Sequence, residues 1–200
     1  MSAMPQDQHP VLSEAEYLAF DRASEIKHEY VEGAIIAMAG ASDRHNLIVA
    51  YTLGALIARL GSNSPCVVRP SDARLRVSDL SRYRYPDLTV TCQPAQFADD
   101  KQDILLNPTV IIEVLSPATR STDFDAKLYE YRQIASVQDY LLVETAQPRI
   151  TRYQRQSGDK WLLSDTIGLD ATLTLESIGV NLPLAAVYAQ VTFETPDERT

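Results

Sequence analysis

Glu113 is a carboxylate in the middle of an apolar run. The run from Thr109 to Leu115 is otherwise almost continuously apolar, which predicts a central strand buried on both faces. An unpaired, ionised carboxylate buried there costs several kcal/mol, so the site must supply a cation, a proton or a set of donors. A metal ion would meet that need. Pairing with an arginine near the end of the strand would meet it equally well, and Glu113 alone leaves both interpretations open.

Asp87 provides a second acid on a neighbouring strand. It follows Pro86 and begins a predicted strand that ends at Cys92. Alternation along this strand places Asp87, Thr89 and Thr91 on one face. Two carboxylates and a backbone carbonyl, completed by water, suit a hard divalent cation such as Mg2+. A Pro-Asp pair by itself is common in structural turns, so the combination of acids, and not the dipeptide, indicates a metal site.

Lys127 is a cation on the helix that follows Glu113. It belongs to a stripe at helical spacing that should face the sheet, so its ammonium could reach the two acids. The alternative is a solvated pair with Asp123 at i, i+4, worth a few tenths of a kcal/mol, and the spacing alone favours this alternative. The members of the stripe are Phe124, Lys127, Leu128, Tyr131 and Ile134.

Local signals predict the first elements that would position these groups. Ser13 to Glu16 forms a capping-box pattern, which predicts a short helix from about Glu14 to Ala23. A β-hairpin is expected over His28 to Met38, where a glycine supplies the positive φ of a tight turn. The longest helix signal starts from an N-cap at Ser42 and stops at Gly61, a residue type suited to the position just past a helix end.

The remaining elements predict a sheet with a helical crossover. A second helix should run from about Thr122 to Ala135 between two buried strands, and such a strand, helix, strand unit implies a parallel pair. A β-meander and a closing helix should follow. The predicted strands are Cys66 to Arg69, Ala73 to Val77, Asp87 to Cys92, Thr109 to Leu115, Tyr140 to Glu144, Ile150 to Arg155, Trp161 to Ser164 and Leu173 to Leu175, and the closing helix is Leu182 to Tyr188.

Composition limits the class of protein. The 200 residues, 45% of them hydrophobic, suffice for one core, and no repeat or linker divides them, so a single domain over 1–200 is expected. Two cysteines without a C-x-x-C motif and three histidines without metal-ligand spacing exclude a disulfide scaffold and a structural zinc site. The polar N-terminus and the lack of a long apolar stretch predict a cytoplasmic protein with no membrane association.

The net charge of -9 argues against non-specific coating of nucleic acid, but the charge is unevenly distributed. Five arginines stand against two aspartates just before Asp87, an arrangement compatible with a polyanionic substrate; a surface hairpin with exposed arginines is the alternative. Any DNA binding should then be weak without divalent metal and steeply salt-dependent. The candidate nucleic-acid contacts are Arg69, Arg74, Arg76, Arg82 and Arg84.

The order of these elements and motifs resembles the PD-(D/E)XK nuclease superfamily. More closely, it is similar to a bacterial putative restriction endonuclease family that was once called a domain of unknown function. The matching features lie between Glu29 and Glu144, well over half of the chain. They are Glu29 to Gly33, Met38 to Ser42 followed by His45, Tyr85-Pro86-Asp87, Glu113 to Pro117 with Thr119, and Asp123, Lys127 and Tyr131.

The resemblance implies a restriction-endonuclease-like α/β fold, in which a central mixed β-sheet is flanked by α-helices and extended by the β-meander. The nuclease core would be about 42–144, with an N-terminal helix and hairpin at about 13–38 and C-terminal strands and a helix at about 149–190. Asp87 and Glu113 would be metal ligands. The superfamily's usual lysine, two residues after the second acid, is replaced by Leu115, and Lys127 is the candidate to supply the amine from the next helix.

Two further residues match family positions near the site. Glu29 could be a further ligand. His45 would contact substrate or cap its helix, and for a lone histidine at a helix start the structural role is favoured.

Metal-dependent hydrolysis of DNA phosphodiester bonds is the leading hypothesis. Asp87, Glu113 and the Val114 carbonyl would hold one or two Mg2+ or Mn2+ ions. Lys127 would orient a water or help to deprotonate it. One alternative is a catalytically inactive nuclease-like module that binds nucleic acid or a protein partner, and another is a hydrolase of a smaller phosphoester. By analogy with nucleases that cut both strands of a duplex, a homodimer is also an expectation.

Overall fold

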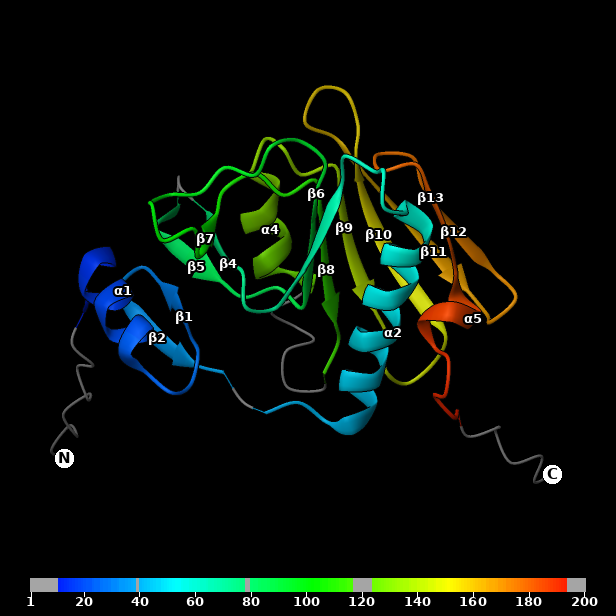
Figure 1. The fold of residues 1–200 in the computed structure, drawn as a ribbon, viewed down its shortest axis with the longest axis horizontal. Coiled ribbons are helices and arrows are strands. Elements are labelled where there is room, and N and C mark those ends of the chain that lie inside the picture. The colour runs from blue at the N-terminus through cyan, green and yellow to red at the C-terminus, as the bar shows by residue number, and fades with distance from the viewer. Residues whose placement is uncertain (1–10, 39, 78–79, 117–123, 194–200) are drawn as a thin grey trace, which may run out of the picture.

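A six-stranded mixed sheet forms the centre of the molecule (Figure 1). The computed structural model describes residues 11–38, 40–77, 80–116 and 124–193. Strand order is β11-β10-β9-β8-β6-β3, and of the five neighbouring pairs only β8 and β9 are parallel, as the predicted helical crossover requires. The strands are β3 (Val67–Pro70), β6 (Leu88–Thr91), β8 (Val110–Val114), β9 (Asp139–Val143), β10 (Arg149–Arg155) and β11 (Trp161–Ile167).

Helix α2 (Asp43–Leu60) covers one face of this sheet. Its N-cap is Ser42, whose hydroxyl accepts from the backbone N–H of His45, and its C-cap is Gly61 at φ 71°. Ile112 and Val114 of β8 face the α2 side, in one hydrophobic cluster with Ile48 and Leu56. The predicted mixed sheet flanked by helices is therefore confirmed.

The opposite face of the six-stranded sheet packs against α4 (Ala126–Arg132), the crossover helix. Ile111 of β8 and Leu115 just after it lie in one cluster with Tyr131 of α4 and with Ile134, two residues beyond that helix. Leu75 of strand β4 (Arg74–Val77) belongs to the same cluster. Because side chains alternate along a strand, Glu113 lies on this α4 side between Ile111 and Leu115. The predicted start of this helix near Thr122 lies outside the described residues.

A second, five-stranded sheet lies beyond α4 in Figure 1, in the order β2-β1-β5-β4-β7. Its hairpin β1–β2 was predicted, with Gly33 at φ 99° in the turn, whereas strands β5 and β7 were not. Helix α1 (Glu14–Ala23) begins with the predicted capping box and buries Tyr17 against Tyr30 and Tyr83. The strands are β1 (His28–Val31), β2 (Ala34–Ala37), β4 (Arg74–Val77), β5 (Arg82–Arg84) and β7 (Ile104–Leu105).

The predicted β-meander of Ile150 to Arg155, Trp161 to Ser164 and Leu173 to Leu175 is confirmed for its first two strands, β10 and β11, which are antiparallel neighbours. Its third strand, β12 (Thr172–Leu175), lies instead in a separate two-stranded sheet with β13 (Val180–Pro183). The predicted closing helix was wrong over its first part, because residues up to Pro183 pair with β12 and alternate between buried and exposed. Only α5 (Leu184–Val187) is helical. No helix within the described ranges has the length and apolar character needed to cross a membrane.

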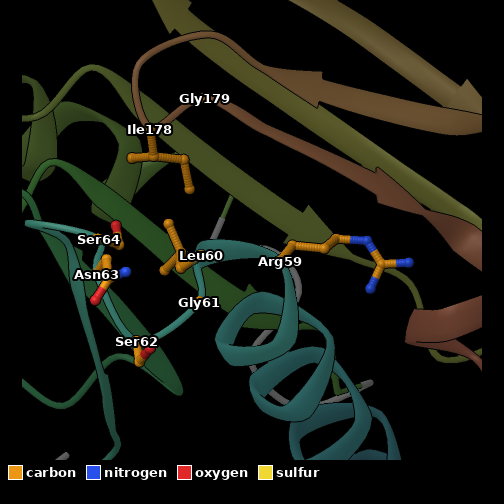
Figure 2. Close-up of a pocket in the computed structure, with 8 residues that line it drawn as sticks. All are labelled: Arg59, Leu60, Gly61, Ser62, Asn63, Ser64, Ile178 and Gly179. Carbon is orange, nitrogen blue, oxygen red and sulfur yellow. The ribbon is translucent and has the colours of Figure 1, made fainter.

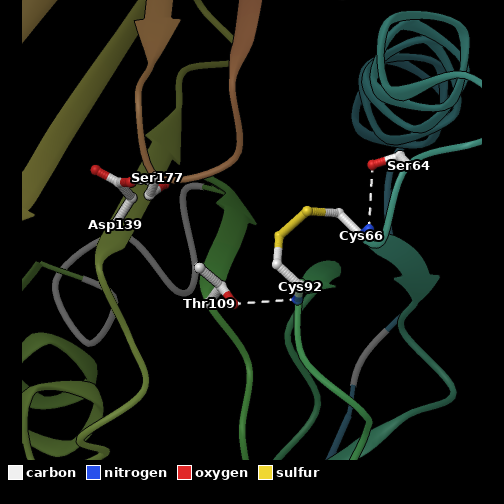
Figure 3. The surroundings of a disulfide bond; sticks show 6 residues. All are labelled: Ser64, Cys66, Cys92, Thr109, Asp139 and Ser177. Carbon is white, nitrogen blue, oxygen red and sulfur yellow. Dashed lines mark hydrogen bonds between the residues drawn. A yellow bond between two sulfur atoms is a disulfide. The ribbon is translucent and has the colours of Figure 1, made fainter.

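Cys66 and Cys92 form a disulfide, shown in Figure 3. They lie one residue beyond the last pair of the β3–β6 ladder, Val67 with Thr91, and so face each other across two antiparallel strands. The prediction that no disulfide scaffold exists therefore needs a correction: a single bridge joins the edge strand to its neighbour. A separation of 26 residues without a C-x-x-C motif carries no local signal for this pairing.

Candidate active site

Asp87 and Glu113 lie opposite each other on antiparallel neighbours. Leu88 of β6 pairs with Ile112 of β8, so the preceding Asp87 is aligned with the following Glu113. The backbone N–H of Val114 donates to Asp87 Oδ2 at 2.7 Å. The structure thus brings the two predicted acids together at one end of the β6–β8 ladder.

Lys127 points inward from α4 to Glu113. Its Nζ donates to Glu113 Oε1 at 2.9 Å, and the two side chains are only 7% and 5% exposed. The solvated arrangement that spacing alone favoured is therefore wrong for Lys127, while Asp123, its suggested partner, lies outside the described residues. The reason is the packing of α4 directly on the face of β8 that carries Glu113.

Tyr131 is a further contact of Glu113. Its hydroxyl donates to Glu113 Oε1 at 2.8 Å, one helical turn after Lys127. Burial, together with the Glu113 charge, raises the pKa of Tyr131 well above its ordinary value, so the phenol stays protonated and remains a donor. The sequence placed Tyr131 on the buried stripe and among the family matches, but not among the candidate site residues.

His45 lies beside Asp87 at the N-terminal end of α2. Its Nε2 is 3.3 Å from Asp87 Oδ2, and the Ser42 cap holds its backbone. Burial alone would lower the pKa of His45, but the contact with Asp87 and smaller contributions, one from the Val114 carbonyl, raise it above its ordinary value. The histidine is thus next to both Asp87 and the backbone of Val114, in a partly buried position.

Glu29 of β1 reaches the same cluster from the five-stranded sheet. Its Oε1 is 3.7 Å from Lys127 Nζ, and its Oε2 accepts from Arg84. Arg84 also donates two hydrogen bonds to Glu130 of α4, which is fully buried. Sequence reasoning missed Glu130, although a carboxylate beside Tyr131 on a short buried helix is itself an indication of a buried ion pair.

The five candidate arginines do not form one exposed surface. Arg74 and Arg84 are 4% and 3% exposed and are paired with acids. The prediction that they contact nucleic acid therefore needs correcting, because both form ion pairs inside the protein. Arg82 pairs with Glu130 as well as Glu32. The other two are more open: Arg76 pairs with Glu14 at 2.9 Å, and Arg69 lies over the ring of Phe97.

The oxygen donors at this cluster fit a hard divalent cation of the Mg2+ type. Asp87 and Glu113 are aligned across two strands, and Val114, the residue after Glu113, donates its backbone N–H to Asp87. No cluster of three or more His, Cys, Asp or Glu side chains suited to a metal occurs within the described ranges. A cation here would therefore depend on the two carboxylates, a backbone carbonyl and water, which suits Mg2+ because it retains several waters.

A pocket of about 480 Å3 lies far from these acids, at the C-terminal end of α2. Figure 2 shows Leu60 and Ile178 pointing toward each other, whereas Arg59 extends away from the other lining residues. Arg59 instead donates to the Ala55 carbonyl of its own helix. The pocket contains none of the candidate site residues, so it adds nothing to the cluster around Glu113.

The chain matches one protein family along most of its length. The sequence model of the Uma2 family, described as "Putative restriction endonuclease", matches residues 14–185. Two relatives come from Synechocystis sp. (strain ATCC 27184 / PCC 6803 / Kazusa). "Uncharacterized protein slr1290" is 31% identical over 189 residues, 94% of this chain and 97% of the relative. "Uncharacterized protein sll1609" is 33% identical over 163 residues, 82% of this chain and 92% of the relative.

A solved structure shares the fold. It is described as a "putative nuclease belonging to DUF820" from Anabaena variabilis ATCC 29413, and it superposes with a TM-score of 0.72. The likeness covers 89% of this chain and 98% of that chain at 18% sequence identity, so it concerns the fold.

Proposed function

Because the chain belongs to the Uma2 family of "Putative restriction endonuclease" proteins, we propose that it is a metal-dependent endonuclease that hydrolyses DNA phosphodiester bonds. The observation that carries the proposal is the alignment of Asp87 with Glu113, with Lys127 Nζ 2.9 Å from Glu113 Oε1. Two carboxylates can hold the metal ion of such a reaction, and an amine beside one of them can orient the attacking water.

Each residue has a defined part in the proposed reaction. Asp87, Glu113 and the Val114 carbonyl would hold Mg2+ or Mn2+. A bound ion supplies Lewis-acid polarisation of the phosphoryl group and a water of lowered pKa. Lys127 orients the attacking water, which it can do from α4 because its Nζ already lies beside Glu113. His45 holds Asp87 Oδ2 in place.

The replacement of the usual lysine by Leu115 is compatible with this assignment. Leu115 is 1% exposed and packs in the cluster with Tyr131, so position 115 supplies no amine. Lys127 provides an amine from the facing helix α4 instead, and its Nζ reaches the carboxylate of Glu113.

A plasmid cleavage assay tests the proposal. Wild-type protein should nick or linearise supercoiled DNA with Mg2+ or Mn2+ and lose this activity when EDTA is added. Asp87→Asn and Glu113→Gln should each abolish cleavage, because they keep the side-chain shape and remove a ligand charge. Asp165→Asn is a matched control, since Asp165 is an acid bonded to Arg149 on the edge of the same sheet. Equal cleavage by wild type and both site variants would refute the proposal.

A catalytically inactive nuclease-like module is the second candidate. Leu115 in the lysine position favours it, and so does the depth of Glu113 and Lys127, which are 4% and 6% exposed. Titration calorimetry with Mn2+ distinguishes the two candidates. An active enzyme should show saturable heat that disappears in Glu113→Gln, whereas an inactive module needs no metal site and should show none.

DNA contact and assembly extend the proposal. Arg82, like Arg74 and Arg84, is paired with a buried acid, which leaves Arg69 and Arg76 as the candidate contacts. Arg76→Ala should therefore weaken DNA binding and reduce its salt dependence. A homodimer would present one site to each strand of a duplex. Sedimentation of the protein with and without a short duplex, at several salt concentrations, measures both the salt dependence of DNA binding and the oligomeric state.

A further inference from the structure

Lys127 belongs to a closed chain of charges that leaves α4 and returns to it. From Lys127 Nζ the chain passes to Glu29 of β1, whose Oε2 accepts from Arg84 Nη1 of β5. Arg84 Nε and Nη2 donate to Glu130 Oε2 and Oε1 at 2.7 and 2.6 Å. Glu130 lies on α4 three residues after Lys127, so the five-stranded sheet holds the helix at two points.

The geometry of this chain is tightly constrained. The side chains of Arg84 and Glu130 are 4% and 0% exposed, and a two-pronged guanidinium–carboxylate pair has a fixed relative orientation. Burial alone would lower the pKa of Arg84, but Glu130 and Glu29 raise it, so the guanidinium remains charged. A buried pair of this kind contributes little net stability compared with apolar packing, which leaves orientation as its distinctive contribution.

Helix α4 needs such a contribution because its own sequence fixes it poorly. It has seven residues, and its N-cap Asp125 makes no side-chain capping hydrogen bond. Helices of this length are marginal without tertiary contacts. The position of an amine on α4, unlike that of one on β8 itself, depends on how the helix is docked.

We propose that Glu130 and Arg84 are positioning residues, which fix Glu29 and the docking of α4 so that Lys127 Nζ is held against Glu113. This inference rests on the proposed function, in which Lys127 orients the attacking water. It also explains why the N-terminal hairpin belongs to the site, since β1 contributes Glu29, the second carboxylate beside Lys127.

Chemical labelling of lysines tests the proposal without any need for cleavage. An amine-reactive reagent followed by peptide mass spectrometry should modify buried Lys127 much more slowly than exposed Lys101 in the wild type. Glu130→Gln should increase the labelling rate of Lys127 by about tenfold and leave Lys101 unchanged. In the cleavage assay it should lower kcat by about tenfold or more without changing KM for DNA, since only the orientation of the amine is lost.

Asp139→Asn is the matched control. Asp139 is also 0% exposed and also accepts from a buried arginine, Arg152, but it lies at the far end of β9 from the partner of Glu113. Both variants should lose thermal stability, and only Glu130→Gln should change the labelling of Lys127 and kcat. If Glu130→Gln does not fold, Glu29→Gln, whose side chain is 12% exposed, should give the same labelling change.

The outcomes separate the two proposals. Unchanged labelling of Lys127 in a folded Glu130→Gln or Glu29→Gln protein overturns the positioning role, whatever the cleavage assay gives. An equal change in Asp139→Asn also overturns it, because the effect would then be general loosening. A wild type that never cleaves DNA refutes the proposed function, and the labelling rates still decide whether the lysine is positioned as inferred.

Discussion

Lys127 Nζ and Glu113 Oε1 are 2.9 Å apart, so an ammonium on α4 neutralises a carboxylate inside β8. Replacing Lys127 by Met should destabilise the protein by roughly 3 kcal/mol, because it leaves the buried Glu113 charge without this cation. The double variant Lys127→Met with Glu113→Gln should recover part of the loss. Urea unfolding measures all three free energies. Lys160→Met, on an exposed turn, is the control, and equal stabilities of the single and double variants would contradict this account.

The Ser42 cap should contribute to stability at the end of α2 that carries His45. Its hydroxyl accepts from the His45 backbone N–H, so Ser42→Ala should cost about 1 kcal/mol. Ser42→Asn keeps an acceptor and should cost less. Thermal unfolding of the two variants provides the comparison. A loss in Ser42→Asn as large as that in Ser42→Ala would show that the cap hydrogen bond is not what matters.

The Cys66–Cys92 bridge should stabilise the oxidised protein. For a loop closed over a separation of 26 residues, the loss of chain entropy in the unfolded state corresponds to about 3.5 kcal/mol. Reduction, or the double substitution Cys66→Ser with Cys92→Ser, should lower the unfolding free energy by an amount of this order. Thiol titration in denaturant before and after reduction reports whether the bridge is present. The same reductant should leave the stability of the double variant unchanged.

Acid should weaken the contact between Arg22 of α1 and Asp103, the residue just before β7. Hydrogen bonds from Arg22, against the opposing effect of burial, lower the pKa of Asp103 from 3.8 to about 2. Since the folded-state pKa is below the unfolded value, Asp103 contributes stability that is complete above about pH 4 and is lost as pH falls through 2. Asp103→Asn should therefore lose stability at neutral pH and approach the wild type near pH 2. A constant difference across that range would refute the assignment.

Local signals were sufficient to predict the elements whose ends depend on neighbouring residues. The capping box at Ser13, the cap at Ser42 and the glycine at 61 place α1 and α2 closely, because the contacts involved span a few residues. The aligned acids followed from the apolar run around Glu113 and the strand after Pro86. Each of these two patterns lies within a single strand, so it can be recognised in the sequence without knowledge of the partner strand.

The missed features depend on partners far along the chain. Strand β5 contains Arg82 and Arg84, and these basic residues can be buried there because Glu130 lies 46 to 48 residues away in the sequence. The inward orientation of Lys127 depends likewise on the packing of α4 against β8. The i, i+4 spacing within the helix contains no information about that packing. The C-terminal helix was overextended because the pairing of β13 with β12 competes with helix formation at residues 180–183.

The position of Glu29 limits how this fold can be divided. Lys127 contacts Glu113 from the six-stranded sheet and Glu29 from the five-stranded sheet, so residues 42–144 alone do not contain both partners. A fragment that begins after the first hairpin, or a chimera that exchanges this hairpin between relatives, would remove the carboxylate on one side of the lysine. The two sheets therefore have to be kept together in any engineered version of the site, although each has a core of its own.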